Sequence, residues 1–486
     1  MKYELKKIFE QYSIKEICQT SKKIQPGQAF FAVAGTKLNG NDFIAEALTN
    51  GAKIVITDQK LDNEIQSDNI FQVEDIKIAL SEALNILYPN LPGNLVAVTG
   101  TNGKTSVVSY CHQLLELLAQ KKSATIGTLG VTCSNAKLNK LFEDESYQSL
   151  TTPDIISFYK IMNILADNDV EYTTFEASSH GIAQNRLGNI EVKVAAFTSF
   201  SQDHLDYHQN MEQYLSAKLQ IFANNLAKDG IAIISSEIVE LELIKSFLDS
   251  KNIKYLTVGN KGDLKINACN QSISGQIVNF SWLGKTYSFT TEIIGSFQAS
   301  NLLISALIVN HLGFSFETII SQLHMLKAAE GRLERITKVD DSFSIFVDYS
   351  HTPDALDKSL SELRKILSKA GKLYVVFGCG GDRDPSKRKP MGLIAAQIAD
   401  VVVITDDNPR HENPEQIRVQ ILSGTDQANE IANRKKAIDF AIKKLLPQDI
   451  LLIAGKGHEK YQIIGDLKIP FDDRQVAKAI LDSICK

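Results

Sequence analysis

One short segment combines glycine, lysine and hydroxyl groups in an order suited to binding phosphate. The apolar run 95–98 leads directly into Thr-Gly-Thr-Asn-Gly-Lys-Thr-Ser at 99–106, and the residues that follow have helical periodicity. Glycines let backbone N–H groups approach phosphate oxygens, and a helix N-terminus favours negative charge. The lysine of such a loop reaches the outer phosphates, and the threonine coordinates Mg²⁺. This segment, the phosphate loop, predicts nucleotide binding by Gly100, Thr101, Asn102, Gly103, Lys104, Thr105 and Ser106.

The phosphate loop is a variant of the usual pattern. That pattern has a glycine five residues before Gly103, where this chain has Val98. The alternative is an ordinary glycine turn that leads into a helix. Because Gly-Lys-Thr stands between a predicted strand and a predicted helix, nucleotide binding is the stronger interpretation.

A second polar segment follows the apolar run 172–175. Glu176 comes directly after this run, at the carboxyl end of a predicted strand, where its oxygens suit Mg²⁺. The alternative is a solvated or salt-bridged glutamate. The next residues, Ser-Ser-His-Gly at 178–181 with Gln184 and Arg186, gather polar donors in one loop and favour a functional role.

A third polar segment, Asp-His-Leu-Asp-Tyr-His at 203–208, follows the apolar run 192–197. Acid and imidazole groups at the end of a strand suit metal or phosphate chemistry. A turn with N-capping aspartates explains them equally well, so the sequence leaves both interpretations open.

Lys218 lies on the apolar stripe of a predicted helix that begins near Met211. Tyr214, Leu215 and Phe222 share that stripe at helical spacing. The ordinary interpretation is a lysine whose stem packs against the core while its ammonium reaches solvent. Periodicity alone gives Lys218 no function.

Four apolar runs in the last third of the chain each lead into a polar loop: 344–347 into 348–354, 372–377 into 378–384, 401–404 into 406–410, and 450–453 into 455–459. Ligands of parallel sheets bind beyond the carboxyl ends of the strands. Asp348 suits ribose hydroxyls, Arg383 and Arg410 suit carboxylates, and Glu459 suits an ammonium group. Each arginine alone could form a surface ion pair, but together these loops predict a site for a zwitterionic amino acid.

The elements that must position these residues predict an α/β protein with three domains. A chain of 486 residues exceeds what one core supports. We expect a small α/β domain at 1–92, a central domain of the phosphate-loop type with a mostly parallel sheet at 93–329, and a Rossmann-like domain at 330–486. Short alternating runs around 283–285 add a β-hairpin to the central domain.

Composition excludes several classes of function. The net charge of -5 gives no basic face for nucleic acid. No signal peptide or membrane-spanning run is found, so we expect a cytoplasmic protein that does not insert into membranes. The six cysteines, at 18, 111, 133, 269, 379 and 485, are scattered and are expected to be free thiols.

The motifs, in this order and spacing, resemble the Mur ligase family of peptidoglycan synthesis. The resemblance covers nearly the whole chain and includes Glu-Gly-Arg at 330–332 and Asp-Tyr-Ser-His-Thr-Pro-Asp at 348–354. It implies a UDP-substrate domain, a central ATPase domain and a C-terminal amino-acid domain. It also implies that a substrate carboxylate attacks the γ-phosphate of ATP to give an acyl phosphate, from which the incoming amine displaces phosphate.

The resemblance further implies a role for each matching residue. The predicted catalytic residues are Lys104, Glu176, His204 and Lys218. The predicted Mg²⁺ ligands are Thr105, Glu176, His204 and Lys218, the last as a carbamate (N6-carboxylysine). Predicted ATP contacts beyond the phosphate loop are Asn301, Arg332, Asp348 and His351. The residues matching UDP-N-acetylmuramoyl-L-alanyl-D-glutamate contacts are Ser21, Thr151, Thr152, Ser178, Gln184 and Arg186. Those matching meso-diaminopimelate contacts are Arg383, Asp407, Asn408, Pro409, Arg410, Gly455 and Glu459.

Three positions depart from the family pattern. Lys22 stands where arginine is usual, and Ser199 and Gln298 stand where asparagine is common. Each keeps hydrogen-bonding character, so the reaction is expected to remain while fine contacts near Ser21 and ATP change. A monomer is expected.

Three rival functions have distinguishing features. A lysine-adding Mur ligase would have a neutral residue at 410, because lysine lacks the second carboxylate that Arg410 can bind. A folylpolyglutamate synthase would not need the N-terminal uridine-binding segment. A nucleotide-binding switch without ligase chemistry would need neither Lys218 on an inward stripe nor the loops that combine acids with histidines.

Overall fold

The structure is a computed structural model that describes residues 2–35, 38–59, 68–143 and 150–484. The chain divides into two compact units. One comprises Met1–Ala97, Gln120–Lys193 and Ala217–Asp229, and the other comprises Val98–Ala119, Val194–Ser216 and Gly230–Lys486. These units do not follow the boundaries 1–92, 93–329 and 330–486, which stay a prediction.

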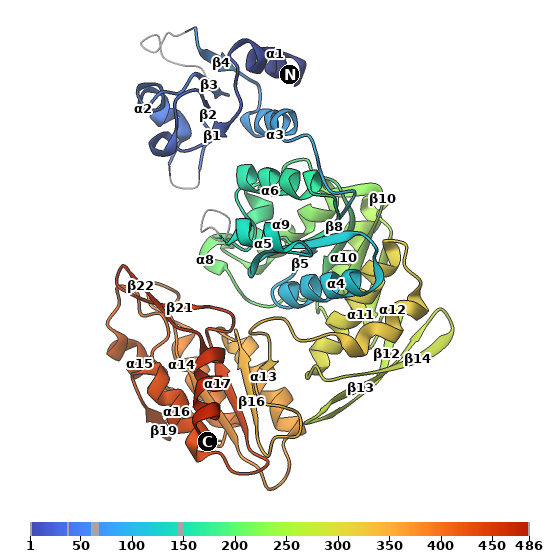
Figure 1. The fold of residues 1–486 in the computed structure, drawn as a ribbon, viewed down its shortest axis with the longest axis vertical. Helices are drawn as coiled ribbons and strands as arrows, with labels where there is room; N and C mark the ends of the chain where they lie inside the picture. The colour runs from blue at the N-terminus through green and yellow to red at the C-terminus, as the bar shows by residue number, and fades with distance from the viewer. Residues whose placement is uncertain (1, 36–37, 60–67, 144–149, 485–486) are drawn as a thin grey trace. The chain divides into compact units, whose positions relative to one another are not determined.

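The first unit contains a four-stranded parallel sheet near the N-terminus (Figure 1). Its strands, in spatial order, are β1 (Ile17–Cys18), β2 (Ala29–Phe31), β3 (Ile54–Thr57) and β4 (Ile70–Gln72). The helices of this region are α1 (Lys2–Gln11), α2 (Ile44–Thr49) and α3 (Ile76–Leu87). Buried Phe30, Ile44 and Val55 form part of the core. The sheet and these helices agree with the small α/β domain expected near the N-terminus.

The first unit also contains a block in which β6 (Lys122–Gly127) lies between two other strands. It pairs antiparallel with β7 (Gly130–Cys133) and parallel with β8 (Val170–Glu176). The helices here are α5 (Ala136–Phe142), α6 (Ile155–Asp167) and α7 (Ser179–Ala183). The apolar stripe of α6 is buried and includes Phe158, whose ring meets Phe175 of β8 edge to face.

Four elements contain residues of both units: β5 (Asn94–Thr99), β9 (Val192–Phe197), α9 (Met211–Asn224) and β10 (Leu226–Ser235). The second unit continues with α4 (Lys104–Leu118), α8 (Leu205–His208) and α10 (Leu241–Ser250). Helix α11 (Ser296–His311) comes later in the chain, and α12 (Phe316–Gln322) follows it.

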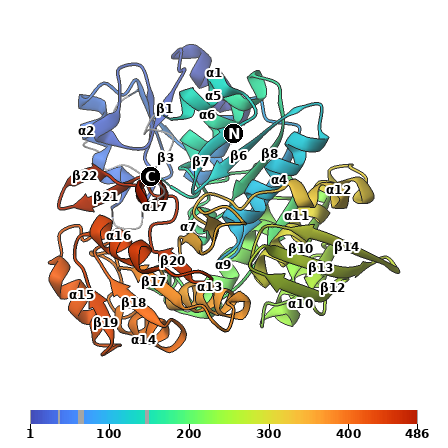
Figure 2. The same ribbon diagram turned by 60° about the horizontal axis from the view of Figure 1, so that its bottom comes forward.

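The second unit has an antiparallel ribbon that extends from parallel strands (Figure 2). In order these strands are β11 (Tyr255–Gly259), β12 (Leu264–Ser272), β13 (Gly275–Trp282) and β14 (Lys285–Thr291). The predicted hairpin at 283–285 is confirmed as the β13–β14 turn. Strand β12, which pairs antiparallel with β13, was not predicted.

The last third of the chain forms a six-stranded, mostly parallel sheet. Its spatial order is β15 (Glu334–Arg335), β16 (Ser344–Asp348), β20 (Ile450–Ala454), β17 (Leu373–Phe377), β18 (Val401–Ile404) and β19 (Ala428–Glu430). Only β15 pairs antiparallel with its neighbour. All four strands predicted for this region are confirmed, and their parallel pairing brings their carboxyl ends to one edge.

Helices cover both faces of this sheet, as expected for a doubly wound domain. One core contains side chains of α13 (Pro353–Ile366), α14 (Arg388–Ile398) and α15 (Pro414–Leu422). The other contains side chains of α16 (Arg434–Lys444) and α17 (Asp473–Ile484). A hairpin, β21 (Tyr461–Ile464) and β22 (Leu467–Pro470), follows β20.

Two expectations from composition bear on the described residues. Within those ranges, no helix has both the length and the apolar character required to cross a bilayer. Cys18, Cys111, Cys133, Cys269 and Cys379 carry thiols and are not joined in disulfides. Cys485 lies outside the residues that the structure describes.

Candidate functional site

The phosphate loop joins the end of β5 to the beginning of α4, as predicted. Gly100 and Gly103 both have positive φ, 146° and 89°. A Cβ on Gly100 would overlap the Thr198 hydroxyl, and one on Gly103 would lie 2.8 Å from Asn301 Oδ1. Glycine is therefore required at both positions. Lys104, the first residue of α4, donates from Nζ to the carbonyls of Gly100 and Thr101, each at 2.9 Å.

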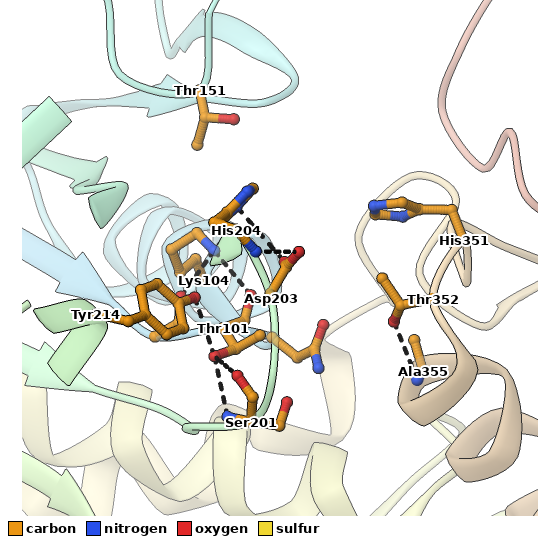
Figure 3. A network of polar contacts seen from close by, with 12 residues as sticks. Thr101, Lys104, Thr151, Ser201, Asp203, His204, Tyr214, His351, Thr352 and Ala355 are labelled. Carbon is orange, nitrogen blue, oxygen red and sulfur yellow. Dashed lines mark hydrogen bonds and ion pairs between the residues drawn. The ribbon is translucent and has the colours of Figure 1, made fainter. Parts of the chain in front are cut away.

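A polar network beside the phosphate loop includes the predicted acid and histidine segment (Figure 3). Ser201 N donates to Thr101 Oγ1 at 3.1 Å, and Tyr214 Oη lies 3.2 Å from the same hydroxyl. Burial raises the pKa of Tyr214, so its hydroxyl stays protonated. His204, in a left-handed conformation, donates from its backbone N to Asp203 Oδ1 at 2.9 Å. The hydrogen bond from Ser201 to Thr101 therefore joins the segment that contains His204 to the phosphate loop.

Residues from the last third of the chain contact the phosphate loop in the same unit. Arg332 Nη2 donates to Thr105 Oγ1 at 3.0 Å, and its guanidinium lies over the ring of Tyr349, 4.6 Å from the centroid. Asp354, in the first turn of α13, accepts at Oδ2 from Asn102 Nδ2 at 3.2 Å and from Ser201 Oγ at 3.1 Å. Arg332, a predicted ATP contact, therefore touches the predicted Mg²⁺ ligand Thr105.

Asp348 is the last residue of β16, and His351 lies in the loop that follows. Asp348 is buried and accepts from Leu333 N at 2.6 Å and from Ser350 N at 2.9 Å, and burial raises its pKa. His351 Nδ1 lies 2.9 Å from Tyr349 O, and burial lowers the pKa of the imidazole. The Asp348 carboxylate thus stabilises its own loop, and its contact with ribose stays a prediction.

The family departures in this region still form hydrogen bonds. Ser199 Oγ accepts from Asn102 N at 2.8 Å. Gln298 Oε1 accepts from Asn301 Nδ2 and Tyr110 Oη, each at 3.0 Å. Both residues therefore support groups that shape the phosphate loop. Lys22 lies exposed near the N-terminus.

In the first unit, Glu176 is buried, with 2% of its surface exposed. It is the last residue of β8 rather than the first residue after it. Thr128 donates to the carboxylate from N at 2.8 Å and from Oγ1 at 3.1 Å. A Cβ on Gly127 would overlap Glu176 Oε1, so this approach requires glycine. The interpretation of Glu176 as a solvated residue is wrong.

Five of the six residues predicted to contact the UDP substrate lie in one network around this strand end. Arg186 donates to Thr152 O at 2.7 Å and, from Nη2, to Gln184 Oε1 at 2.7 Å. Thr152 Oγ1 donates to Glu176 O at 2.8 Å and accepts from Ser178 N at 2.9 Å. Thr151 is the fifth member of the network, and its hydroxyl lies 3.2 Å from Thr128 Oγ1, which bonds to Glu176. Ser21 lies outside this network and donates to Glu46 Oε2 at 2.7 Å.

Lys218 of α9 is buried, with 1% of its surface exposed. The interpretation of an ammonium that reaches solvent is therefore wrong. Among the residues that the structure describes, no three His, Cys, Asp or Glu side chains gather as a metal site would require. An unmodified lysine is a cation, and only its carbamate would supply oxygen ligands. The Mg²⁺ site formed by Thr105, Glu176, His204 and Lys218 stays a prediction.

Three loops, at 378–384, 406–410 and 455–459, follow β17, β18 and β20 at one edge of the last sheet and are called the C-terminal loops. Arg410 Nη1 donates to Gly381 O at 2.7 Å, and Gly381 N donates to Asn408 O at 2.9 Å. The backbone N of Arg410 donates to Ile463 O of β21 at 3.1 Å. Arg383 is exposed. The structure therefore brings the predicted diaminopimelate residues together.

Sequence reasoning missed Lys456, which lies between the predicted residues Gly455 and Glu459. Its side chain is fully buried, and Nζ lies near Asp407 Oδ1 (3.3 Å), Asn408 Oδ1 (2.9 Å) and Glu459 Oε2 (3.1 Å). The available signal was a lysine flanked by glycines directly after a wholly apolar strand.

Three segments match known family profiles. Residues 98–309 match the Mur ligase middle domain, 331–457 the Mur ligase glutamate ligase domain, and 13–95 the Mur ligase family catalytic domain. A protein of Rickettsia conorii named UDP-N-acetylmuramoyl-L-alanyl-D-glutamate--2,6-diaminopimelate ligase is 52% identical over 483 residues, 98% of each chain. The chain belongs to the Mur ligase family. It is therefore a ligase with an N-terminal, a central and a C-terminal Mur ligase domain.

Solved structures support the same fold for this Mur ligase. A structure of a UDP-N-acetylmuramoyl-L-alanyl-D-glutamate--2,6-diaminopimelate ligase matches with a TM-score of 0.70 at 30% identity, covering 97% of this chain and 96% of that one. The folylpolyglutamate synthase of Mycobacterium tuberculosis with ADP matches with a TM-score of 0.63 at 19% identity, covering 78% of this chain and 92% of that one. The second likeness shows a shared fold alone.

Proposed function

We propose that this ligase uses ATP to join meso-2,6-diaminopimelate to the D-glutamate of UDP-N-acetylmuramoyl-L-alanyl-D-glutamate. The observation that carries the proposal is the position of Arg410, which lies half-buried among the C-terminal loops with its guanidinium beside Gly381. The name of the Rickettsia conorii relative supports the same reaction. The product is a precursor of peptidoglycan.

Arg410 supports the choice of amino acid on chemical grounds. Diaminopimelate differs from lysine by a second carboxylate at its far end. A guanidinium offers a planar fork of N–H donors that binds a carboxylate through two hydrogen bonds. Lysine would leave those donors without a partner, and a site built to hydrogen-bond a group rejects an analogue that lacks it. The exposed guanidinium of Arg383 adds positive charge to the same loops.

The reaction begins when the glutamate carboxylate attacks the γ-phosphate of ATP, which forms an acyl phosphate and releases ADP. Lys104 is expected to turn from the Gly100 and Thr101 carbonyls to the transferring phosphoryl group. Asn301, Arg332 and His351 are expected to hold the nucleotide. The amine of diaminopimelate then attacks the acyl carbon and displaces inorganic phosphate.

Mg²⁺ is the expected cofactor, and it would neutralise charge on the phosphates of ATP. Thr105, Glu176 and His204 would supply a hydroxyl, a carboxylate and an imidazole as ligands. Lys218 would complete the site as a carbamate, formed when its neutral amine attacks CO₂ and loses a proton. Its burial supports this assignment, because burial disfavours the charged ammonium and so favours the neutral amine that reacts with CO₂.

The remaining assignments follow from the same proposal. Ser21, Thr151, Thr152, Ser178, Gln184 and Arg186 are expected to bind the UDP substrate. We expect the protein to be cytoplasmic, because both nucleotide substrates are cytoplasmic. We also expect a monomer. The domain boundaries 1–92, 93–329 and 330–486 stay part of the proposal.

A phosphate-release assay tests the proposed function. The purified chain is incubated with ATP, Mg²⁺ and UDP-N-acetylmuramoyl-L-alanyl-D-glutamate, and with diaminopimelate, lysine or ornithine. We expect turnover with diaminopimelate and at least a hundredfold lower kcat/KM with lysine. Preference for lysine would contradict the specificity, and no turnover with any amino acid would contradict the ligase reaction with this substrate.

Replacement of Lys218 tests the carbamate separately. Lys218→Ala should lose activity, and added formate or acetate should restore part of it, because a small carboxylate can take the place of the carbamate. The same additions to a Lys104→Ala variant are the control and should restore nothing. Full activity of Lys218→Ala without additions would show that the carbamate role is wrong.

A further inference from the structure

Lys456 is a fully buried cation whose three partners all belong to the C-terminal loops. A lysine ammonium has three N–H donors and no acceptor. Nζ lies within 3.3 Å of Asp407 Oδ1, Asn408 Oδ1 and Glu459 Oε2, so each donor has a partner. The side chain therefore joins the loop after β18 to the loop after β20.

The same contacts fix the orientation of the Asn408 amide. Its Oδ1 accepts from Lys456 Nζ at 2.9 Å and from Ile463 N at 3.0 Å. Both partners can only donate, so the oxygen of the amide must face them. The nitrogen then faces Glu459 and donates to Oε2 at 2.8 Å. Without the ammonium of Lys456, the amide would lose one of the two donors that set this orientation.

The orientation of Glu459 follows from two donors, Lys456 Nζ and Asn408 Nδ2. Its Oε2 accepts from both Lys456 and Asn408. Among the described residues, no hydrogen bond to its Oε1 is found, and the side chain is 18% exposed. Asp407 and Glu459 carry two negative charges against the one positive charge of Lys456. The group therefore retains negative charge with an oxygen available to an arriving cation.

We propose that Lys456 is a positioning residue for the amino-acid substrate. Its buried ammonium orients Asn408 and Glu459 so that Glu459 Oε1 accepts a hydrogen bond from an ammonium group of the incoming amino acid. This inference rests on the proposed function, since it assigns the C-terminal loops to the amino acid. Lys456 itself does not touch the substrate.

The test is Lys456→Met, which keeps the length and removes the charge. We expect the KM for diaminopimelate to rise about tenfold to a hundredfold, as for the loss of hydrogen bonds to charged groups. The KM for ATP and for the UDP substrate should stay within about twofold, because a uniform structural defect would not act on one substrate alone. Lys460→Met is the matched control at an exposed position nearby and should leave all three values unchanged.

A second variant covers the case in which Lys456→Met fails to fold. Lys456→Gln removes the charge but keeps an N–H donor for the buried oxygens around it. It should fold and show the same selective rise in the KM for diaminopimelate. An unchanged KM for the amino acid in either folded variant, or an equal rise for all three substrates, would overturn the positioning role.

The outcomes separate this proposal from the proposed function. If the parent enzyme turns over diaminopimelate and the variants match it, only the role of Lys456 is wrong. If the parent shows no turnover, binding of diaminopimelate and of lysine is measured by calorimetry on the parent and both variants. Weaker binding by the variants would then support Lys456 while the ligase reaction fails, and equal or undetectable binding would reject Lys456 as well.

Discussion

The phosphate loop and the C-terminal loops both follow buried strands, but their lysine side chains bond to different groups. In the phosphate loop, Lys104 donates to backbone carbonyls, and Thr101 N donates to the backbone of Ser199 at 2.8 Å. The C-terminal loops depend on buried cations. Arg388 donates to Gly380 O at 3.0 Å, and Lys456 joins two loops.

This difference teaches where each site is sensitive to substitution. The Lys104 side chain bonds to carbonyls of its own loop, which other side chains also hold, so its loss should fall mainly on the chemistry. A loop held by a buried cation loses shape and stability together, because the partner anion stays buried without its counter-charge. Single substitutions in the two regions should therefore separate activity from stability.

The largest effect is expected for Lys104→Ala. Removal of the ammonium should lower kcat/KM in the phosphate-release assay about a thousandfold, because charge that develops in the transition state loses a pre-positioned cation. The two hydrogen bonds from Nζ to carbonyls of its own loop are lost as well, and the change in melting temperature measures their contribution to stability. Lys140→Ala, an exposed lysine of α5, is the control. A drop of less than tenfold would contradict the role of Lys104.

A buried cation beside the C-terminal loops should show the opposite behaviour. Arg434 of α16 is buried and forms two hydrogen bonds of 2.7 Å with Asp473, and it donates to Ala454 O at 2.8 Å. Arg434→Met should lower the free energy of unfolding by about 3 to 5 kcal/mol, because Asp473 remains buried and unpaired. Denaturant unfolding of the full chain measures this.

The paired variant Arg434→Met/Asp473→Leu sharpens the test. With both charges replaced by apolar groups, most of the lost stability should return. A single variant that loses less than about 1 kcal/mol, or a double variant no more stable than the single one, would show that the C-terminal region does not depend on this buried pair.

The same contrast explains how much the sequence could predict. Apolar runs located the strands that precede the phosphate loop, Glu176, the segment 203–208 and the C-terminal loops, and the spacing of Gly103, Lys104 and Thr105 located the phosphate loop. Both are local patterns. Periodicity also placed Lys218 on an inward stripe, but could not tell whether its ammonium reaches solvent, because that depends on what packs against the helix.

Buried pairs escaped prediction because their members are far apart in the chain. Lys456 lies 49 residues from Asp407 and 48 from Asn408, and Arg434 lies 39 residues from Asp473. Single-sequence patterns carry no information on such pairs. Strand β12 was missed for a related reason, since its exposed polar residues do not form an apolar run and its pairing with β11 and β13 defines it.

The smallest expected effect concerns His458, where the two regions meet. Gly331 and Gly457 approach so closely that a Cβ on Gly331 would overlap the backbone of Gly457. The Tyr349 ring lies 4.9 Å from the ring of His458 and also beneath Arg332, which donates to Thr105. Burial, then the charges of Arg332 and Arg474, lowers the pKa of His458 from 6.5 to about 3.

This lowered pKa sets the sign of a pH effect on stability. Between about pH 6.5 and 3, the unfolded chain binds a proton at His458 that the folded chain does not, so the free energy of unfolding falls as the pH falls. His458→Gln removes this term. From pH 7 to pH 5, the variant should lose about 2 kcal/mol less than the parent. Exposed His324→Gln is the control, and equal pH dependence in parent and His458→Gln would show that the imidazole is not held neutral between the two regions.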